Sequence, residues 1–274
     1  MRGSRVTEPT AVPATAPATV PATVPATVPA TATAQEIVTH KITVARTARY
    51  ATTGAAPADT ARLWIVFHGY GTRAADFIAP FADAAPDDTR VIAPEGLSRF
   101  YAEMPRPDGG HLTRVGASWL TRDDRDDELR DAMAMLHAVV AREYAGVMAA
   151  RAVAPQLGVL GFSQGVAMSL RFATDLANNP ALGRAARLNT HIVWAGGLAH
   201  DVTDAAVRAA WADTTVRVVV GERDQFATDA FRESMRARLF TIGATTTEHT
   251  FAGGHRLDTP MLAALLAQML VSAD

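Results

Sequence analysis

A serine flanked by glycines, Ser163, lies where the chain is predicted to turn from a strand into a helix. Residues 161–165 read Gly-Phe-Ser-Gln-Gly. The apolar residues 156–160 favour a buried strand, and the Ala- and Leu-containing residues 166–173 favour a helix. A strand, a sharp turn and a helix form a nucleophile elbow, which exposes the serine hydroxyl beside a helix N-terminus that favours a developing anion. Because Gly-x-Ser-x-Gly also occurs by chance in glycine-rich chains, the pattern indicates catalysis only together with partner residues.

A second motif could stabilise the charge formed when such a serine attacks a carbonyl. Residues 68–71, His-Gly-Tyr-Gly, follow the apolar residues 62–67, another buried-strand pattern. In elbow-type sites the loop after this strand and the residue after the nucleophile each donate a backbone N–H group to the oxyanion. The predicted donors are therefore Tyr70 and Gln164. Losing one such donor typically costs about 100-fold or more in rate.

The first residue of the second motif, His68, is itself a candidate base. A histidine that precedes the nucleophile in the chain breaks the order of triad residues expected with an elbow. We therefore interpret His68 as a structural residue that shapes the loop.

A carboxylate and a histidine that could complete a triad follow later strands. Asp224 ends the sequence Gly-Glu-Arg-Asp directly after the apolar residues 216–220, so its carboxylate is placed to orient a base. It could also be an ordinary turn aspartate, and Glu222 and Asp229 are nearby alternatives. His255 follows two glycines that would leave its imidazole exposed, and is predicted to exchange the serine proton. His249, within a predicted strand, is a weaker competitor.

Taken together, these motifs resemble the carboxylesterase/phospholipase branch of the α/β-hydrolases, which includes acyl-protein thioesterases and small bacterial serine esterases. The order Ser163, Asp224, His255 is the order of α/β-hydrolases, and Gly-Phe-Ser-Gln-Gly is more specific to this branch than the generic pentapeptide. The resemblance extends from about residue 39 to the C-terminus. It implies a hydrolase of carboxylic esters that needs no metal or cofactor. Residues 97–125 depart from it as a long insert-like segment.

Composition agrees with one large α/β domain. The chain has 274 residues, of which 49% are hydrophobic, enough for a sizeable core. The formal net charge of −2 gives no electrostatic drive toward nucleic acid or an anionic membrane. The absence of cysteine excludes disulfides, thiolate metal sites and a cysteine nucleophile. No apolar run reaches ~20 residues, so no transmembrane segment is expected.

The N-terminal region has a different character. Residues 9–34 repeat Pro-Ala-Thr-Val with small variations. Frequent proline blocks helices and sheet ladders, and few large apolar side chains are present to bury. We predict a disordered Pro/Ala/Thr-rich tail over residues 1–36 and an α/β-hydrolase domain over residues 37–274. A spacer, a docking segment or an O-glycosylated segment are alternatives for the tail. The basic start lacks an apolar h-region, so we expect no secretory signal peptide and a cytoplasmic location.

Strands and helices are predicted to alternate along the domain. Strands are expected at residues 37–45, 48–53, 63–67, 90–94, 157–160, 191–195, 216–220 and 247–251, and helices at residues 76–84, 127–151, 166–173 and 260–271. This alternation predicts a mostly parallel central sheet with helices on both faces. Ligands bind at the carboxyl ends of such strands, and all four motifs follow strand ends.

Residues 98–119 are the predicted specificity region. Tyr101, Met104 and Trp119 are expected to line an acyl or alcohol pocket, because such pockets are mostly apolar. The alternative is that they pack this segment onto the domain. The charged residues 122–128 are interpreted as a solvated helix start, with acids near the N-terminus, and not as a metal site.

The sequence therefore predicts a serine carboxylesterase that hydrolyses short-to-medium-chain esters through an acyl-enzyme intermediate, with a small-molecule ester as its partner. A thioesterase or lysophospholipase with the same triad is an alternative. A non-catalytic hydrolase-fold binding protein and an acyltransferase that uses an alcohol in place of water are two others.

Overall fold

The computed structural model describes residues 37–105, 111–179, 182 and 187–269, so the predicted tail lies outside the described residues. The chain divides into two units, residues 1–45 and residues 46–274. In the first unit, the strand predicted at residues 37–45 is not formed, and no ladder includes these residues. The side chains of Ile37 and Ile42 are 93% and 86% exposed, so the apolar pattern of this segment is not matched by burial.

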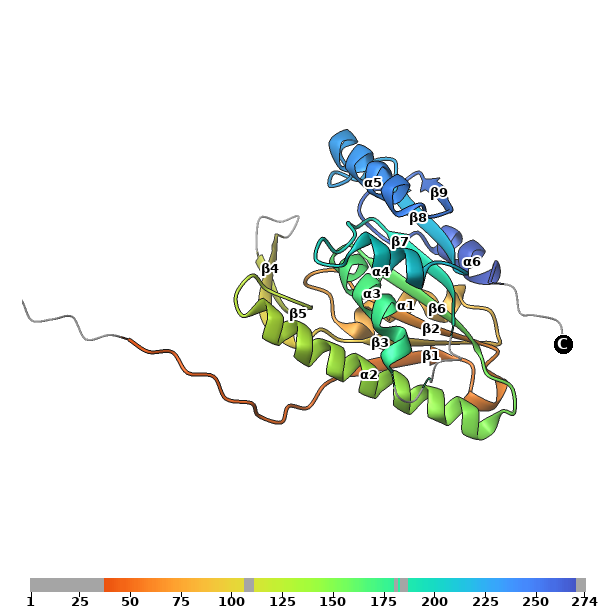
Figure 1. Ribbon diagram of the computed structural model, residues 1–274, viewed down its shortest axis with the longest axis horizontal. Helices are drawn as coiled ribbons and strands as arrows, with labels where there is room; N and C mark the ends of the chain where they lie inside the picture. Colours follow the sequence, from red (N-terminus) through yellow and green to blue (C-terminus); the bar gives the residue numbers. More distant parts are fainter. Residues whose placement is uncertain (1–36, 106–110, 180–181, 183–186, 270–274) are drawn as a thin grey trace, which may run out of the picture. The chain divides into compact units, whose positions relative to one another are not determined.

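The second unit is built around a seven-stranded sheet with the order β1-β3-β2-β6-β7-β8-β9 (Figure 1). Its strands are β1 (Tyr50–Gly54), β2 (Arg62–Phe67), β3 (Thr89–Pro94), β6 (Gln156–Phe162), β7 (Leu188–Trp194), β8 (Thr215–Gly221) and β9 (Thr246–Phe251). Only β1 runs antiparallel to its neighbour. Phe67 pairs with Gly161 and Phe162 with Trp194, so the carboxyl ends of β2, β6 and β7 lie side by side.

Helices cover both faces of this sheet. They are α1 (Ala74–Ala84), α2 (Arg125–Ala150), α3 (Gln164–Asp175), α4 (Asp204–Ala210), α5 (Asp229–Ile242) and α6 (Thr259–Ala267), with 3₁₀ turns η1 (Pro57–Asp59) and η2 (Leu176–Asn178). On one face, Phe81 of α1 and Leu265 of α6 belong to the same buried cluster as Trp64 of β2. On the other, α2 and α3 cover β2 and β6, and α3, α4 and α5 cover β7 and β8. The predicted α/β architecture, a mostly parallel sheet between two helix layers, is confirmed.

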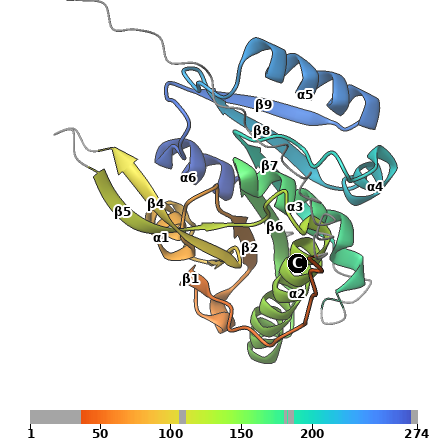
Figure 2. The same cartoon turned by 90° about the vertical axis from the view of Figure 1, so that its left-hand side faces the viewer.

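A β-hairpin stands apart from the central sheet. Its strands β4 (Ser98–Pro105) and β5 (His111–Ser118) pair only with each other, antiparallel and without a shift in register. Figure 2 shows the hairpin projecting from the domain beside α1. It occupies the insert-like segment that departs from the family pattern, where no strands were predicted.

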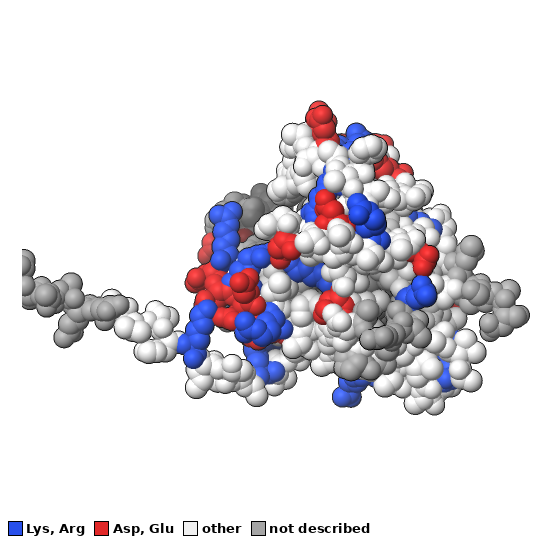
Figure 3. Space-filling view, viewed as in Figure 1, with Lys and Arg blue, Asp and Glu red and all other residues white. Residues whose placement is uncertain are grey.

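Acidic and basic side chains are mixed on the surface. In Figure 3 they gather around the hairpin and the start of α2, and wide areas between them are uncharged. Several of these groups are paired, as in the ion pairs Arg125–Asp201 and Arg130–Asp127. Among the described helices, none has both the length and the apolar composition that crossing a bilayer requires.

Candidate active site

Ser163 occupies a strained turn between β6 and α3. Its backbone angles are φ 54° and ψ −119°, a region that non-glycine residues rarely adopt. The turn is held on both sides, because Ser163 N donates to Trp194 O (2.9 Å) and Ser163 O accepts from Val166 N (3.0 Å). A Cβ atom at Gly165 would lie 2.2 Å from Phe67 O, so β2 could not approach the turn if a larger residue stood there. The glycine after the serine is thus required by close packing.

Three side chains from three separate segments form a continuous hydrogen-bonded chain. His255 Nε2 lies 2.9 Å from Ser163 Oγ, and His255 Nδ1 lies 2.9 Å from Asp224 Oδ2. The Asp224 side chain is 1% exposed and the His255 side chain 19%. With Nδ1–H donating to the carboxylate, Nε2 is left to accept the hydroxyl proton of Ser163. The structure therefore brings together the three residues that the sequence predicts as a triad.

The loop that carries Asp224 is fixed from two directions. Phe226 N donates to Asp224 Oδ1 at 2.9 Å, which leaves the other carboxylate oxygen to His255. From the first turn of α5, the guanidinium group of Arg232 donates to Ala227 O (2.9 Å) and to Gly221 O (3.1 Å). One arginine thus joins the two ends of the loop. Arg232 was not predicted from the sequence, since nothing local in a helical segment indicates such a bridge.

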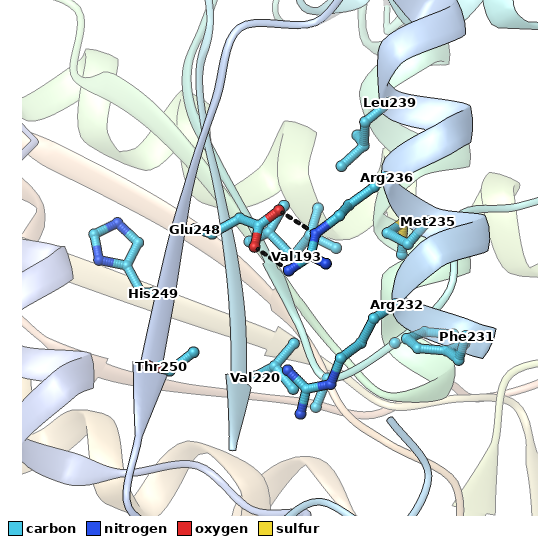
Figure 4. Close-up of a pocket in the computed structure, with 13 residues that line it drawn as sticks. Val193, Val220, Phe231, Arg232, Met235, Arg236, Leu239, Glu248, His249 and Thr250 are labelled. Carbon is cyan, nitrogen blue, oxygen red and sulfur yellow. Dashed lines mark hydrogen bonds and ion pairs between the residues drawn. The ribbon is translucent and has the colours of Figure 1, made fainter. Parts of the chain in front are cut away.

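The alternative acids and base are not part of this chain of contacts. Glu222 is exposed and Asp229 begins α5 with an exposed side chain. His249 lies on β9, where its Nε2 is 3.2 Å from Thr247 Oγ1. Burial, and secondarily the charge of Arg217, lower the pKa of His249 below its usual value. Figure 4 shows its ring on the side of β9 that faces away from α5.

The two predicted oxyanion donors, Tyr70 and Gln164, border the same cleft as Ser163. Gln164 is the first residue of α3, so its N–H group has no partner within the helix. Tyr70 precedes Gly71, which has φ +72° and whose N–H donates to Ala117 O (2.8 Å). Among the described residues, no protein acceptor is bonded to the N–H group of Tyr70 or Gln164. Both groups are thus free to bind an anion in the cleft.

His68 is held as a buried structural residue. Its Nδ1 lies 2.8 Å from Gly69 O, and its Nε2 accepts a hydrogen bond of 2.9 Å from Gly96 N. Burial lowers the pKa of His68 to about 4, so the ring is neutral at pH 7. Trp119 stacks on this ring with 4.6 Å between centroids and donates its indole N–H to His68 O (2.8 Å). These contacts agree with the structural interpretation of His68.

The placement of Trp119 corrects its predicted role as a pocket-lining residue. Its side chain is 1% exposed and packs in the core, where it supports the loop of Tyr70 from behind. Tyr101 is 79% exposed on β4 and, in the described part of the chain, does not border the cleft. Met104 pairs with Leu112 in the hairpin, and its side chain lies outside what the structure describes. Trp119 therefore packs its segment onto the domain, and its indole N–H group is bonded to His68 O.

The cleft at Ser163 has a volume of about 700 Å³. It is lined by Gly69, Tyr70, Thr72, Phe162, Ser163, Gln164, Ala167, Ala195, Gly196, Gly197, Phe226, Ala227, Phe231 and His255. Rings of Phe162 and Phe226 lie 5.0 Å and 4.7 Å from the imidazole of His255. Among the described lining residues there is no aspartate, glutamate, lysine or arginine. This volume and these uncharged walls suit a small neutral ligand.

A profile of the phospholipase/carboxylesterase family matches residues 51–270. The chain belongs to this family. As a member of the phospholipase/carboxylesterase family with an α/β-hydrolase fold, the protein is a carboxylic ester hydrolase, which confirms the predicted family and enzyme class. A comparison with curated protein sequences finds no significant match.

Solved structures share the fold of this carboxylesterase at low sequence identity. The esterase PE8 is 21% identical (TM-score 0.52), with 81% of this chain and 99% of that chain covered. The acyl-protein thioesterase 2 of Zea mays is 16% identical (TM-score 0.54), with coverages of 81% and 98%. A phospholipase/carboxylesterase of Dyadobacter fermentans is 17% identical (TM-score 0.55), with coverages of 83% and 98%. At these identities the likeness establishes the fold and not the substrate.

Proposed function

We propose that this hydrolase is a serine carboxylesterase acting on neutral esters with short-to-medium acyl chains through an acyl-enzyme intermediate. The observation that carries the proposal is the hydrogen-bonded series Asp224, His255, Ser163 opening onto an uncharged cleft. Nucleophile and base within hydrogen-bonding reach, with the base oriented by a third group, is the arrangement that covalent catalysis requires. Neutral walls favour substrates without a carboxylate or phosphate near the ester bond.

The residues in the cleft would act in two half-reactions. Ser163 Oγ transfers its proton to His255 Nε2 and attacks the ester carbonyl carbon, and the carbonyl oxygen becomes an oxyanion bound by the N–H groups of Tyr70 and Gln164. The imidazolium, stabilised by Asp224, then gives its proton to the alcohol oxygen as the C–O bond breaks. Water repeats the sequence with His255 as base, releasing the acid and restoring the serine hydroxyl.

The test is hydrolysis of p-nitrophenyl esters from acetate to palmitate by wild type and Ser163→Ala. We expect wild-type turnover to peak at short or medium chains and the variant to lose it. An initial burst of p-nitrophenol equal to the enzyme concentration, or labelling of Ser163 by a fluorophosphonate, would identify the covalent step. Turnover retained by Ser163→Ala would contradict the assignment. A higher kcat/KM for acyl thioesters than for matched oxygen esters would favour the thioesterase function over the esterase function.

A further inference from the structure

A second, smaller cavity lies directly behind the cleft, between α5 and strands β7 to β9 (Figure 4). Its volume is about 30 Å³, enough to admit a water molecule. Seven apolar residues line it together with Gly196, Arg232, Arg236, Glu248, His249 and Thr250; the apolar ones are Val193, Ala195, Val218, Val220, Phe231, Met235 and Leu239. Towards solvent it is bordered by the ion pair of Arg236 with Glu248 (3.1 Å), drawn as dashed lines in Figure 4. We call this cavity the inner crevice.

The inner crevice and the cleft share three lining residues, Ala195, Gly196 and Phe231. Of these, only Phe231 has a large side chain. A Cβ atom built on Gly197 would lie 3.5 Å from Phe231 Cε2, which places the ring against the floor of the cleft. Phe231 N donates to Thr228 Oγ1 (3.2 Å), the N-cap of α5, so the first turn that carries the ring is fixed. The phenyl ring is therefore the partition between the two spaces.

Phe231 and His255 border the cleft of Ser163 from opposite faces of the sheet. The ring of Phe162 lies 5.0 Å from His255 and 6.2 Å from Phe77 of α1, on the face that α1 and α6 cover. Phe231 packs with Val193 in the cluster on the face covered by α3 to α5. The leaving alcohol must lie near His255, which protonates its oxygen. The acyl chain, attached to the other side of the carbonyl carbon, then extends toward Phe231.

We propose that Phe231 limits the acyl chain length that the enzyme accepts, by closing the cleft against the inner crevice. This inference rests on the proposed esterase function. Each methylene group that an apolar wall buries contributes about fourfold to transition-state binding. In the wild type this gain ends where the chain meets the phenyl ring. Without the ring, the cleft would open into the inner crevice along the apolar side chains of Val220 and Met235.

The experiment compares Phe231→Ala and Phe231→Trp with wild type, and Phe240→Ala is the matched control. Phe240 lies on the same helix, is 88% exposed and borders neither space. For each protein, kcat/KM is measured on p-nitrophenyl esters of increasing even chain length. We expect Phe231→Ala to move the optimum about two to four carbons longer, since the ring occupies roughly the room of four methylenes. Phe231→Trp should shorten it, and Phe240→Ala should reproduce the wild-type profile.

A second series keeps the acetyl group and lengthens the alcohol. Phe231→Ala should leave the alcohol-length profile as in wild type. A shift in the alcohol-length profile, with the acyl-length profile unchanged, would overturn the proposal. An unchanged acyl optimum in both Phe231 variants would overturn it as well, and the tryptophan variant decides the question if the alanine variant is poorly folded. Failure of the proposed function itself has a different signature, because wild-type turnover would then be absent or would persist in Ser163→Ala.

Discussion

The side-chain amide of Gln164 is hydrogen-bonded to Ser118, across 46 positions of sequence, with 2.9 Å between Gln164 Nε2 and Ser118 Oγ. The same amide donates to Leu120 O (3.2 Å) and accepts from Trp119 N (3.2 Å). Residue Ala117, one position earlier, accepts from Gly71 N. The segment that leads from the hairpin into α2 therefore contacts the side chain of Gln164 and the backbone of Gly71, the residue that follows Tyr70.

Replacement of Gln164 by alanine should lower kcat while changing KM little. The variant keeps the backbone N–H group but loses the side-chain bonds that fix the start of α3 against Ser118 and Trp119. Because an oxyanion donor acts only if it is aimed at the transition state, we expect kcat to fall about 10-fold or more. Steady-state assays should show that kcat falls, and binding assays that the affinity for a trifluoromethyl ketone falls by a similar factor. The melting temperature should shift by only a few degrees.

Ser118→Ala provides the control for this interpretation. It removes one partner of the same contact without touching α3, so its effect and that of Gln164→Ala should not add in the double variant. Additive losses, or a loss in KM alone, would show that the Gln164 side chain does not position the donor.

Asp224→Asn should reduce kcat by about 10⁴-fold with little change in overall stability. The amide can still accept from Phe226 N, but it no longer stabilises the imidazolium form of His255 and favours the wrong tautomer. Glu222→Gln is the matched control. It also removes a carboxylate charge, but from an exposed side chain two residues before Asp224. Measuring kcat of both variants on the same ester would show which of the two carboxylates, Asp224 or Glu222, supports His255. Comparable losses in the two would mean that the acid is misassigned.

The local chemistry of the site could be predicted from the sequence because each piece follows a strand. Ser163 needs a sharp turn with glycine at a close approach. Asp224 follows the apolar residues 216–220, and His255 follows β9, the strand paired with β8. The predicted family is confirmed by the profile match and the predicted fold by the sheet topology, whereas the roles of the site residues stay predictions. The strand predicted at residues 37–45 was wrong, since an apolar pattern alone supplies no partner strand.

The walls of the cleft could not be predicted in this way. Trp119 and Phe231 are both aromatic residues in polar surroundings, and sequence gives no sign that one is buried beneath a loop while the other borders the cleft. The difference depends on where the hairpin and α5 pack, which is a tertiary property. The hairpin itself was missed because residues 98–118 alternate weakly between apolar and polar positions.

Two adjacent glycines after β7 should respond differently to alanine. A Cβ atom at Gly196 would lie 2.2 Å from Ser163 O, and one at Gly197 would lie 3.5 Å from the Phe231 ring, an ordinary contact. Gly196→Ala must therefore displace the nucleophile turn, and we expect about a 100-fold or greater loss of kcat/KM together with a lower melting temperature. Gly197→Ala should stay within about threefold of wild type. Equal tolerance of both substitutions would show that the turn is less tightly held.

Stability should fall steadily as the pH drops below about 6.5, because two histidines are buried in the neutral form. Burial lowers the pKa of His68 to about 4 and that of His191 to about 3. His191 accepts from Trp211 Nε1 (3.0 Å), and its Nε2 lies 2.9 Å from Ser169 Oγ. Both rings are neutral in either state at pH 7. Between pH 6.5 and 4 the unfolded chain binds protons that the folded protein excludes, so the free energy of unfolding decreases by up to about 1.4 kcal/mol per pH unit for each histidine.

This pH dependence can be assigned to a single ring by substitution. Urea unfolding of wild type and His191→Gln at pH 7, 6, 5 and 4 gives the slope of the unfolding free energy against pH. Glutamine can still accept from Trp211 and donate to Ser169 but cannot titrate. Since His68 and, with its lowered pKa, His249 also contribute, we expect the variant to lose about a third to a half of the wild-type slope. His200→Gln, at an exposed position, should keep it. A slope that is the same in His191→Gln and wild type would mean that this ring takes up its proton without unfolding.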